Sequence, residues 1–222
     1  MRQRSWIIAL LVVGFALFLI ILNFKKQVSL WNAVPSNSAL VLRNNFEQLD
    51  SLPNLFFIQQ IKKDHQLLNN FNLPKNQEIL TVLQTGTPDG FNALFITKKG
   101  SAFQAETINQ NLQTSQLQGV EVFRNNQFAF AQHKGLLLIA PHAMQVESAI
   151  QQLNSGQTIS KTPLSDTQKE IFLFPRNTDY FLTPLVESSF RNPLRFLKTT
   201  DGAVSGDLQL FDQGFIFKGS IT

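Results

Sequence analysis

EILTVLQT, from Glu78 to Thr85, and FNALFIT, from Phe91 to Thr97, are two runs rich in apolar and β-branched residues. The segment between them, GTPDG at residues 86–90, consists of residues that favour turns. Two such runs joined by a short glycine-containing loop are typical of a β-hairpin. This hairpin decides the fold class, because strands joined by short loops pair antiparallel.

Working outward from the hairpin, strands arrive in twos and threes with helical patterns between these groups. Further strands are predicted at Ser38–Arg43, Val120–Arg124, Phe128–Gln132, Leu136–Ala140, Ile171–Phe174, Ala203–Phe211 and Phe215–Ile221. Helices are predicted from about Phe46 to Phe71, and at Ser101–Leu112, Met144–Leu153 and Tyr180–Leu197. We therefore expect an α+β fold with mainly antiparallel sheets and with the helices packed on one face.

The order strand, helix, strand, strand occurs twice in the chain. Each copy has a short apolar strand followed by Arg-Asn, and the copies are offset by 133 residues when Arg43 is aligned with Arg176. This pattern predicts a divergent internal duplication, with units at 38–157 and 168–222. The second unit ends directly after an apolar strand, which suggests that the chain is a truncated piece of a longer protein.

WIIALLVVGFALFLIILNF, from Trp6 to Phe24, predicts a membrane-spanning helix. The run from Trp6 to Leu22 holds no charged side chain. As a helix the whole segment would be about 28 Å long, close to the thickness of the hydrocarbon core of a bilayer. A cleaved signal peptide is the main alternative, but the run is longer than the usual apolar core and no small-residue cleavage site follows it.

The leader before this segment favours a cytoplasmic N-terminus. It is five residues long, Met1–Ser5, and carries Arg2 and Arg4, and a short basic leader normally stays in the cytoplasm while the following domain is exported. We expect a leader and signal anchor at residues 1–26, a tether at 27–37 and an α+β ectodomain at 38–222. The localisation that follows is the bacterial cytoplasmic membrane, with the domain outside the cytoplasm.

The net charge of +4 belongs to the predicted anchor. Arg2, Arg4, Lys25 and Lys26 supply four of the 19 basic residues, and the remaining 15 balance the 15 acidic residues. A neutral domain lacks the basic surface that binding to phosphate backbones requires. The composition therefore argues against nucleic acid as a partner.

Residues suited to metal binding or catalysis are few and scattered. The chain has no cysteine, and no two of its three histidines have the one-turn spacing of a helical zinc site. His65 is predicted on the exposed face of a helix together with Asp64, His133 in a hairpin turn, and His142 at the start of a helix. No motif requires a metal or another cofactor.

Hydrolase signatures are equally sparse. Ser205 precedes Gly206, but the full G-x-S-x-G nucleophile elbow is missing. A glycosidase-like carboxylate pair such as Glu170 and Glu187 can be drawn from the sequence, without any pattern to support it. A membrane-tethered hydrolase with an unrecognised site therefore remains an alternative to a binding protein.

The repeated Arg-Asn pair is the most distinctive polar feature. Arg43 and Asn44 follow one predicted strand, and Arg176 and Asn177 follow its counterpart. If both pairs lie at equivalent edges of a duplicated sheet, their four side chains can together contact an anionic ligand or a partner. The simpler interpretation is that each Asn caps the helix after its strand.

VPSNSALVL, from Val34 to Leu42, directly after one N-terminal membrane helix, resembles the opening of an uncharacterised family of bacterial single-pass envelope proteins, known as a domain of unknown function. The resemblance implies an exported α+β domain and carries no catalytic residues. Our leading hypothesis is a non-enzymatic, membrane-anchored envelope protein. Its domain would bind a partner protein, a lipid or a cell-wall component. A membrane scaffold facing the cytoplasm is a further alternative.

Overall fold

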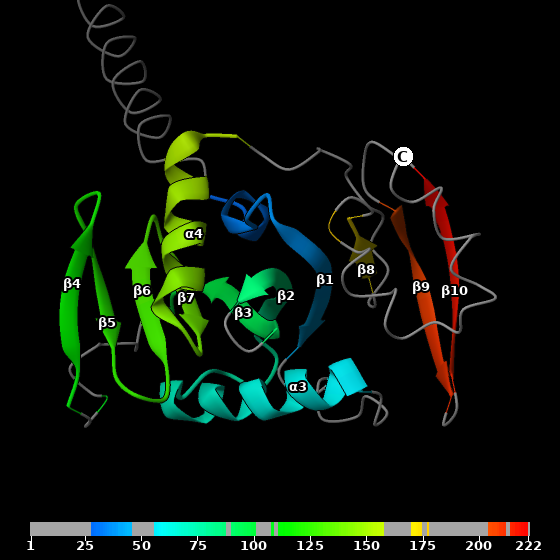
Figure 1. Ribbon diagram of the computed structural model, residues 1–222, viewed down its shortest axis with the longest axis horizontal. Coiled ribbons are helices and arrows are strands. Elements are labelled where there is room, and N and C mark those ends of the chain that lie inside the picture. Colours follow the sequence, from blue (N-terminus) through cyan, green and yellow to red (C-terminus); the bar gives the residue numbers. More distant parts are fainter. Residues whose placement is uncertain are drawn as a thin grey trace, which may run out of the picture.

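The computed structural model describes residues 28–45, 56–87, 90–100, 108, 111–157, 170–174, 177, 204–211 and 214–221. Its strands form one ten-stranded sheet in the order β10-β9-β8-β1-β2-β3-β7-β6-β5-β4 (Figure 1). The strands are β1 (Ser38–Asn45), β2 (Glu78–Thr87), β3 (Gly90–Lys98), β4 (Gln113–Leu117), β5 (Val120–Arg124), β6 (Ala129–His133), β7 (Leu136–Ala140), β8 (Glu170–Leu173), β9 (Val204–Phe211) and β10 (Gly214–Ile221). The helical elements are η1 (Leu30–Ala33), α3 (Phe56–His65), η2 (Gln66–Phe71) and α4 (Ala143–Ser155).

Every pairing in this sheet is antiparallel, which confirms the predicted fold class. The hairpin predicted at residues 78–97 is β2–β3, with Ile79 opposite Thr97 and Leu83 opposite Ala93. The predicted meander is β5–β6–β7. Its last turn contains Lys134 and Gly135 at φ 48° and 79°, the left-handed conformation that a two-residue hairpin turn needs.

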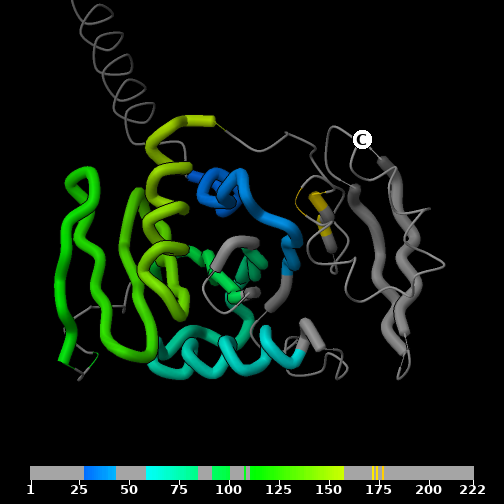
Figure 2. The backbone as a smooth tube through the Cα atoms, in the orientation of Figure 1, coloured from blue at the N-terminus to red at the C-terminus, as the bar shows by residue number. Residues whose placement is uncertain are grey.

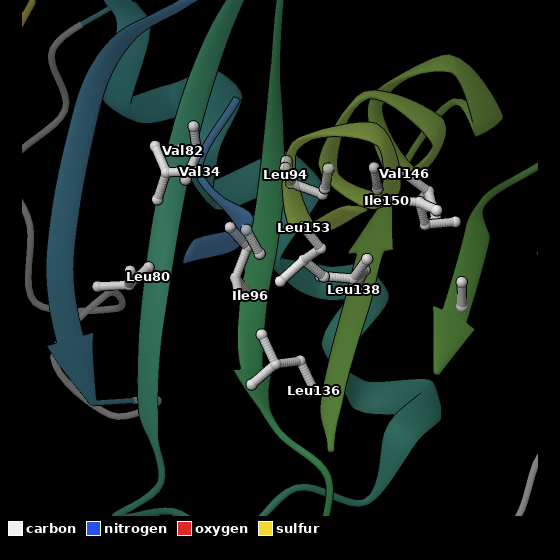
Figure 3. Packing of buried hydrophobic residues seen from close by; sticks show 14 of the residues in the cluster. Val34, Leu80, Val82, Leu94, Ile96, Leu136, Leu138, Val146, Ile150 and Leu153 are labelled. Atoms are coloured by element: carbon white, nitrogen blue, oxygen red, sulfur yellow. The ribbon is translucent and has the colours of Figure 1, made fainter. Parts of the chain in front are cut away.

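The helices cover both faces of the sheet, so the prediction that they pack on one face is wrong. On one side, the α4 face, η1 and α4 cover a cluster formed by Val34, Leu80, Val82, Leu94, Ile96, Leu136, Leu138, Val146, Ile150 and Leu153, among others (Figure 3). On the other side, the α3 face, α3 and η2 cover Leu40, Leu42, Ile79, Leu83, Phe95, Leu137 and Ile139.

The reason for this two-sided cover is visible in β2. Two consecutive residues of this strand, Ile79 and Leu80, point to opposite faces of the sheet, and both are completely buried. A strand with apolar side chains on both sides needs cover on both sides. The continuous apolar run in β2, which does not alternate with polar residues, is the signal for such a layout.

The segment expected to be a tether, 27–37, is partly built into the core. Leu30, Ala33 and Val34 are buried in the α4-face cluster. Trp31 packs edge-on against Phe172 of β8, with ring centroids 4.5 Å apart. The folded part therefore includes η1 and begins before Ser38.

Strands β1 and β8 pair at the middle of a symmetric arrangement. On one side of this pair the order is β1-β2-β3, and on the other it is β8-β9-β10. In both sets, three strands that follow one another in the chain lie side by side. The β1–β8 register places Leu40 opposite Leu173 and Arg43 opposite Glu170.

Strand β4 was not predicted, because its sequence, QTSQL, is almost wholly polar and has no alternation. The predicted helices at Ser101–Leu112 and Tyr180–Leu197 lie largely or wholly outside the described residues, as does the segment Trp6–Phe24. Within the part of the chain that is described, no helix has the length and apolar character needed to span a bilayer.

Candidate functional site

The Arg-Asn pairs are the first candidates, and Arg43 occupies the far end of β1. Its Nε donates to Oε1 of Glu78 over 2.6 Å, and the two side chains are 37% and 40% exposed. This ion pair neutralises the guanidinium charge that an anionic ligand would use. The side chain of Asn44 and the whole of Arg176 lie outside the described residues.

Asn177 lies at the opposite end of β1. Its Nδ2 donates to the backbone oxygens of Ser36 and Ser38, over 2.9 and 2.8 Å. Because β1 and β8 run antiparallel, the residues that follow β8 lie beside the start of β1. At about 3.3 Å per residue, the stretch from Ser38 to Arg43 separates the two sites by about 17 Å. The structure therefore does not bring Arg43 and Asn177 together.

Asp64 and His65, both predicted to be exposed, are buried. Their exposed fractions are 4% and 5%, and His65 packs edge-on against Phe95, with centroids 6.2 Å apart. The sequence did contain a signal for this burial. Asp64 and His65 lie between Ile61 and Leu68 at the helical spacing of one face, and both of those residues are buried on the α3 face.

The Asp64 carboxylate attaches α3 to the start of β3. Its Oδ2 accepts the backbone N–H of Ala93 at 2.8 Å, and its Oδ1 accepts Nε2 of Gln60 at 2.9 Å. The pairing of β3 with β7 reaches only from Lys98 to Phe95. At Ala93, which lies beyond the end of that pairing, the Asp64 carboxylate accepts the backbone N–H in place of a carbonyl group of a neighbouring strand.

Burial raises the pKa of Asp64 from 3.8 to about 6. The bond from the Ala93 N–H, the charge of Lys63, the bond from Gln60 and the charge of His142 all act in the opposite direction. Desolvation therefore outweighs the favourable contacts of the ionised form. A carboxyl group with a pKa in this range changes its charge state close to neutral pH.

The second helix reaches the same end of β3 from the other face of the sheet. Gln145 of α4 is 1% exposed, and its Nε2 donates to the backbone oxygen of Asn92 at 3.0 Å. The Oδ1 of Asn92 lies 3.4 Å from Nε2 of Gln60. The buried Asp64, Asn92 and Gln145 and the half-buried Gln60 thus form a polar cluster, which we call the β3 cluster, joining both helices to one strand.

The chemistry available in the β3 cluster is narrow. It holds one carboxyl group among amides, so it offers a single proton-exchanging group without a nucleophile beside it. In the described ranges no three His, Asp or Glu side chains are grouped so that they could hold a metal ion. The Nδ2 of Asn92 and the Oε1 of Gln145 have no hydrogen-bond partner within those ranges.

His133 and His142 stand apart from one another. His133, the last residue of β6, forms a 2.8 Å hydrogen bond with Oδ1 of Asn154. His142 occupies the N-cap position of α4, as the sequence predicted. The two carboxylates considered as a glycosidase-like pair cannot be compared. Glu170 lies in β8, but its side chain is not among those described, and Glu187 lies outside the described residues.

Strand β4 forms one edge of the sheet (Figure 2). In the described part of the chain, β4 pairs with one strand, β5, and Ser115 lies opposite Val122. The side chains of Gln113, Thr114 and Gln116 are exposed, and those of Ser115 and Leu117 are half-buried. The hairpin turn into β5 uses Gln118 and Gly119 at φ 51° and 78°.

Comparison with known proteins gives only weak structural similarity. No family model and no curated protein matches the chain. Among the solved structures that are similar are crystal forms IV and I of TP0453. Form IV has a TM-score of 0.43 at 12% identity, covering 87% of this chain and 80% of that one. Form I has a TM-score of 0.42 at 10% identity, covering 87% and 77%. Similarity at this level carries no functional conclusion.

Proposed function

We propose that this chain is a non-enzymatic, single-pass protein of the bacterial cell envelope whose exported domain binds a partner protein along β4. The apolar segment Trp6–Phe24 would hold it in the cytoplasmic membrane with the N-terminus inside. Of the three partner classes, protein, lipid and cell-wall component, the geometry of β4 favours protein.

The observation that carries this proposal is the unprotected edge that β4 presents. An edge strand exposes a row of backbone N–H and C=O groups, and proteins usually block such edges with charged residues, proline or a bulge. QTSQL contains no charge and no proline, and its pairing with β5 runs without a register shift. Among the described strands, β5 alone pairs with β4, so its other side is open to an added strand in that part of the structure.

The occupant that fits this edge is an extended segment of a partner protein. Such a segment would continue the antiparallel ladder, with backbone hydrogen bonds supplying affinity and side chains supplying selectivity. The exposed amides and hydroxyl of Gln113, Thr114 and Gln116 suit a partner strand with polar, uncharged side chains. No large apolar side chain is exposed in β4, which disfavours a lipid there.

The ectodomain also fits our proposal of an internal duplication. Two units of the same strand order, joined through β1 and β8, would produce the symmetric order of the six strands from β10 to β3. The second unit would then end at β10, the other edge of the sheet.

The topology can be tested with intact spheroplasts carrying the full chain. If the domain is exported, added protease digests it without lysis. A domain that survives until the cells are lysed would contradict the proposed orientation and support a scaffold that faces the cytoplasm.

Binding along β4 can be tested by introducing a photo-crosslinking residue at Gln116, with Gln151 on the exposed side of α4 as the matched control. We expect one adduct of defined mass from position 116 and none from position 151. An adduct with twice the mass of the chain would identify a second copy as the partner. Equal labelling from both positions would refute a specific site on β4.

A further inference from the structure

We propose that Asp64 makes the seating of α3 on the sheet depend on pH, so that the helix is held when the carboxyl group is protonated and loosened when it is ionised. This proposal is independent of the partner bound at β4. It concerns the β3 cluster, which the proposed function does not use.

The geometry places Asp64 where its charge acts on the contact between α3 and the sheet. The carboxylate is 4% exposed and lies against the backbone of Ala93 in β3. On the same face of the helix, Ile61 is completely buried against the α3-face cluster. Any movement that returns Asp64 to water therefore lifts the buried face of α3 as well.

The charged groups around Asp64 do not fully compensate its burial. Lys63 lies on its own helix and His142 at the start of α4, and both favour the ionised form. His65 follows on the same helix, buried beside Phe95. From β3 the cluster receives only the uncharged groups of Asn92 and Ala93. Desolvation remains the largest effect, and it raises the pKa to about 6.

The direction of the effect follows from the two pKa values. The folded-state pKa, about 6, is above the unfolded value of 3.8. The stabilising contribution is therefore complete below about pH 4 and is lost as the pH rises through 6. A difference of about two pH units corresponds to a change of about a hundredfold in the equilibrium between seated and open forms.

Movement of α3 alone is sufficient to hydrate the carboxylate. The α3-face and α4-face clusters are separated by the sheet, so α3 can open while α4, η1 and the strands keep their contacts. Local opening of this kind has a lower free-energy cost than global unfolding.

The protonated form can keep the contact to Gln60. A protonated carboxyl group donates one hydrogen bond, and the amide of Gln60 can rotate to present its oxygen instead of Nε2. Asp64→Asn is also uncharged, and it offers one acceptor oxygen for the Ala93 N–H and an amide N–H that can donate to Gln60. This substitution is therefore the permanent mimic of the seated state.

The test is hydrogen exchange measured by mass spectrometry on the full chain in detergent micelles, at pH 5 and pH 7.5, corrected for the intrinsic exchange rate. For the wild type, we expect peptides covering 56–65 to lose about tenfold of their protection between pH 5 and pH 7.5, because the rest of the hundredfold change takes place below pH 5. Peptides covering α4 should not change, and Asp64→Asn should keep full protection at both pH values. Glu121→Gln, which removes an exposed acid from β5, should behave as the wild type.

Constant protection of α3 in the wild type, or the same loss in Asp64→Asn, would overturn the proposal. If Asp64→Asn does not fold, His142→Gln provides the second comparison. It removes a charge that lowers the pKa of Asp64, so the midpoint of the transition should move to higher pH. A midpoint that stays at its wild-type value would assign the transition to a group other than Asp64.

Discussion

Leu40 of β1 lies directly opposite Leu173 of β8, and the two residues are 133 positions apart in the chain. This is the offset that aligns Arg43 with Arg176. If the two halves are copies, Leu40 and Leu173 are equivalent residues that meet at the axis relating them. The remaining pairs of this register, from Val41 opposite Phe172 to Arg43 opposite Glu170, all follow on one side of it.

Leu40→Ala is expected to destabilise the domain by about 2–5 kcal/mol, because it leaves a cavity in the α3-face cluster at the β1–β8 junction. The measurement is denaturant unfolding. Met144→Ala is the control, since that side chain is 47% exposed and should change stability by less than about 0.5 kcal/mol. Equal losses in both variants would contradict a junction packed at Leu40.

Asp64→Asn is expected to raise the free energy of unfolding at pH 7.5 by as much as about 3 kcal/mol, and to have little effect below pH 4. The reason is that the wild type must keep a buried carboxylate ionised at the higher pH. Thermal unfolding between pH 4 and pH 8 provides the measurement. A variant that is less stable than the wild type at pH 7.5 would contradict the raised pKa of Asp64.

Arg43 and Glu78 are expected to contribute less than about 1 kcal/mol through their ion pair, since both side chains are more than one-third exposed. A double-mutant cycle with Arg43→Met and Glu78→Gln measures this coupling directly. The coupling should weaken further in high salt. A coupling of several kcal/mol would mean that the pair has a structural role beyond a surface contact.

Gly119→Ala is expected to weaken the β4–β5 hairpin by about 1 kcal/mol, because the residue at this position has a φ of 78°. Gly100→Ala is the matched control. A Cβ at Gly100 meets no atom within 4 Å, and its φ lies outside the left-handed range. Hydrogen exchange of residues 113–124 should increase only in the first variant, and the same increase in both would argue against a conformational cause.

Thr114→Lys combined with Gln116→Lys is expected to abolish binding at β4 while leaving the unfolding midpoint nearly unchanged. Both side chains are exposed, so the fold tolerates the change, and two lysines on an edge oppose the addition of another strand. The readout is the adduct from a photo-crosslinker placed at Gln113. An adduct that persists in the double variant would place the contact elsewhere.

Much of the sheet follows from local sequence pattern, but the positions of the helices do not. Hairpins such as β2–β3 and β6–β7 are set by short loops between apolar runs, and the structure contains both. Which face a helix covers depends on packing between distant segments. The adjacent apolar residues Ile79 and Leu80 require cover on both faces of the sheet, which the predicted one-sided helix layer does not provide.

The burial of Asp64 and His65 was not predicted, because residue type and residue spacing point to opposite conclusions there. The polarity of Asp64 and His65 suggested exposure, whereas their spacing from Ile61 and Leu68 placed them on the buried stripe. Spacing was the better guide. The Arg-Asn pairs failed as a joint site for another reason, since only the antiparallel β1–β8 register shows that their strand ends point in opposite directions.

The late pairing of β1 has a consequence for synthesis and folding. Strand β1 is central in the finished sheet, yet its partner β8 begins only at Glu170. Until that part of the chain has been made, one side of an apolar strand, SALVLRNN, remains an open edge while β2 already occupies the other. Contacts over such long separations form slowly. The growing chain therefore passes through a stage in which one side of β1 is open to wrong pairing.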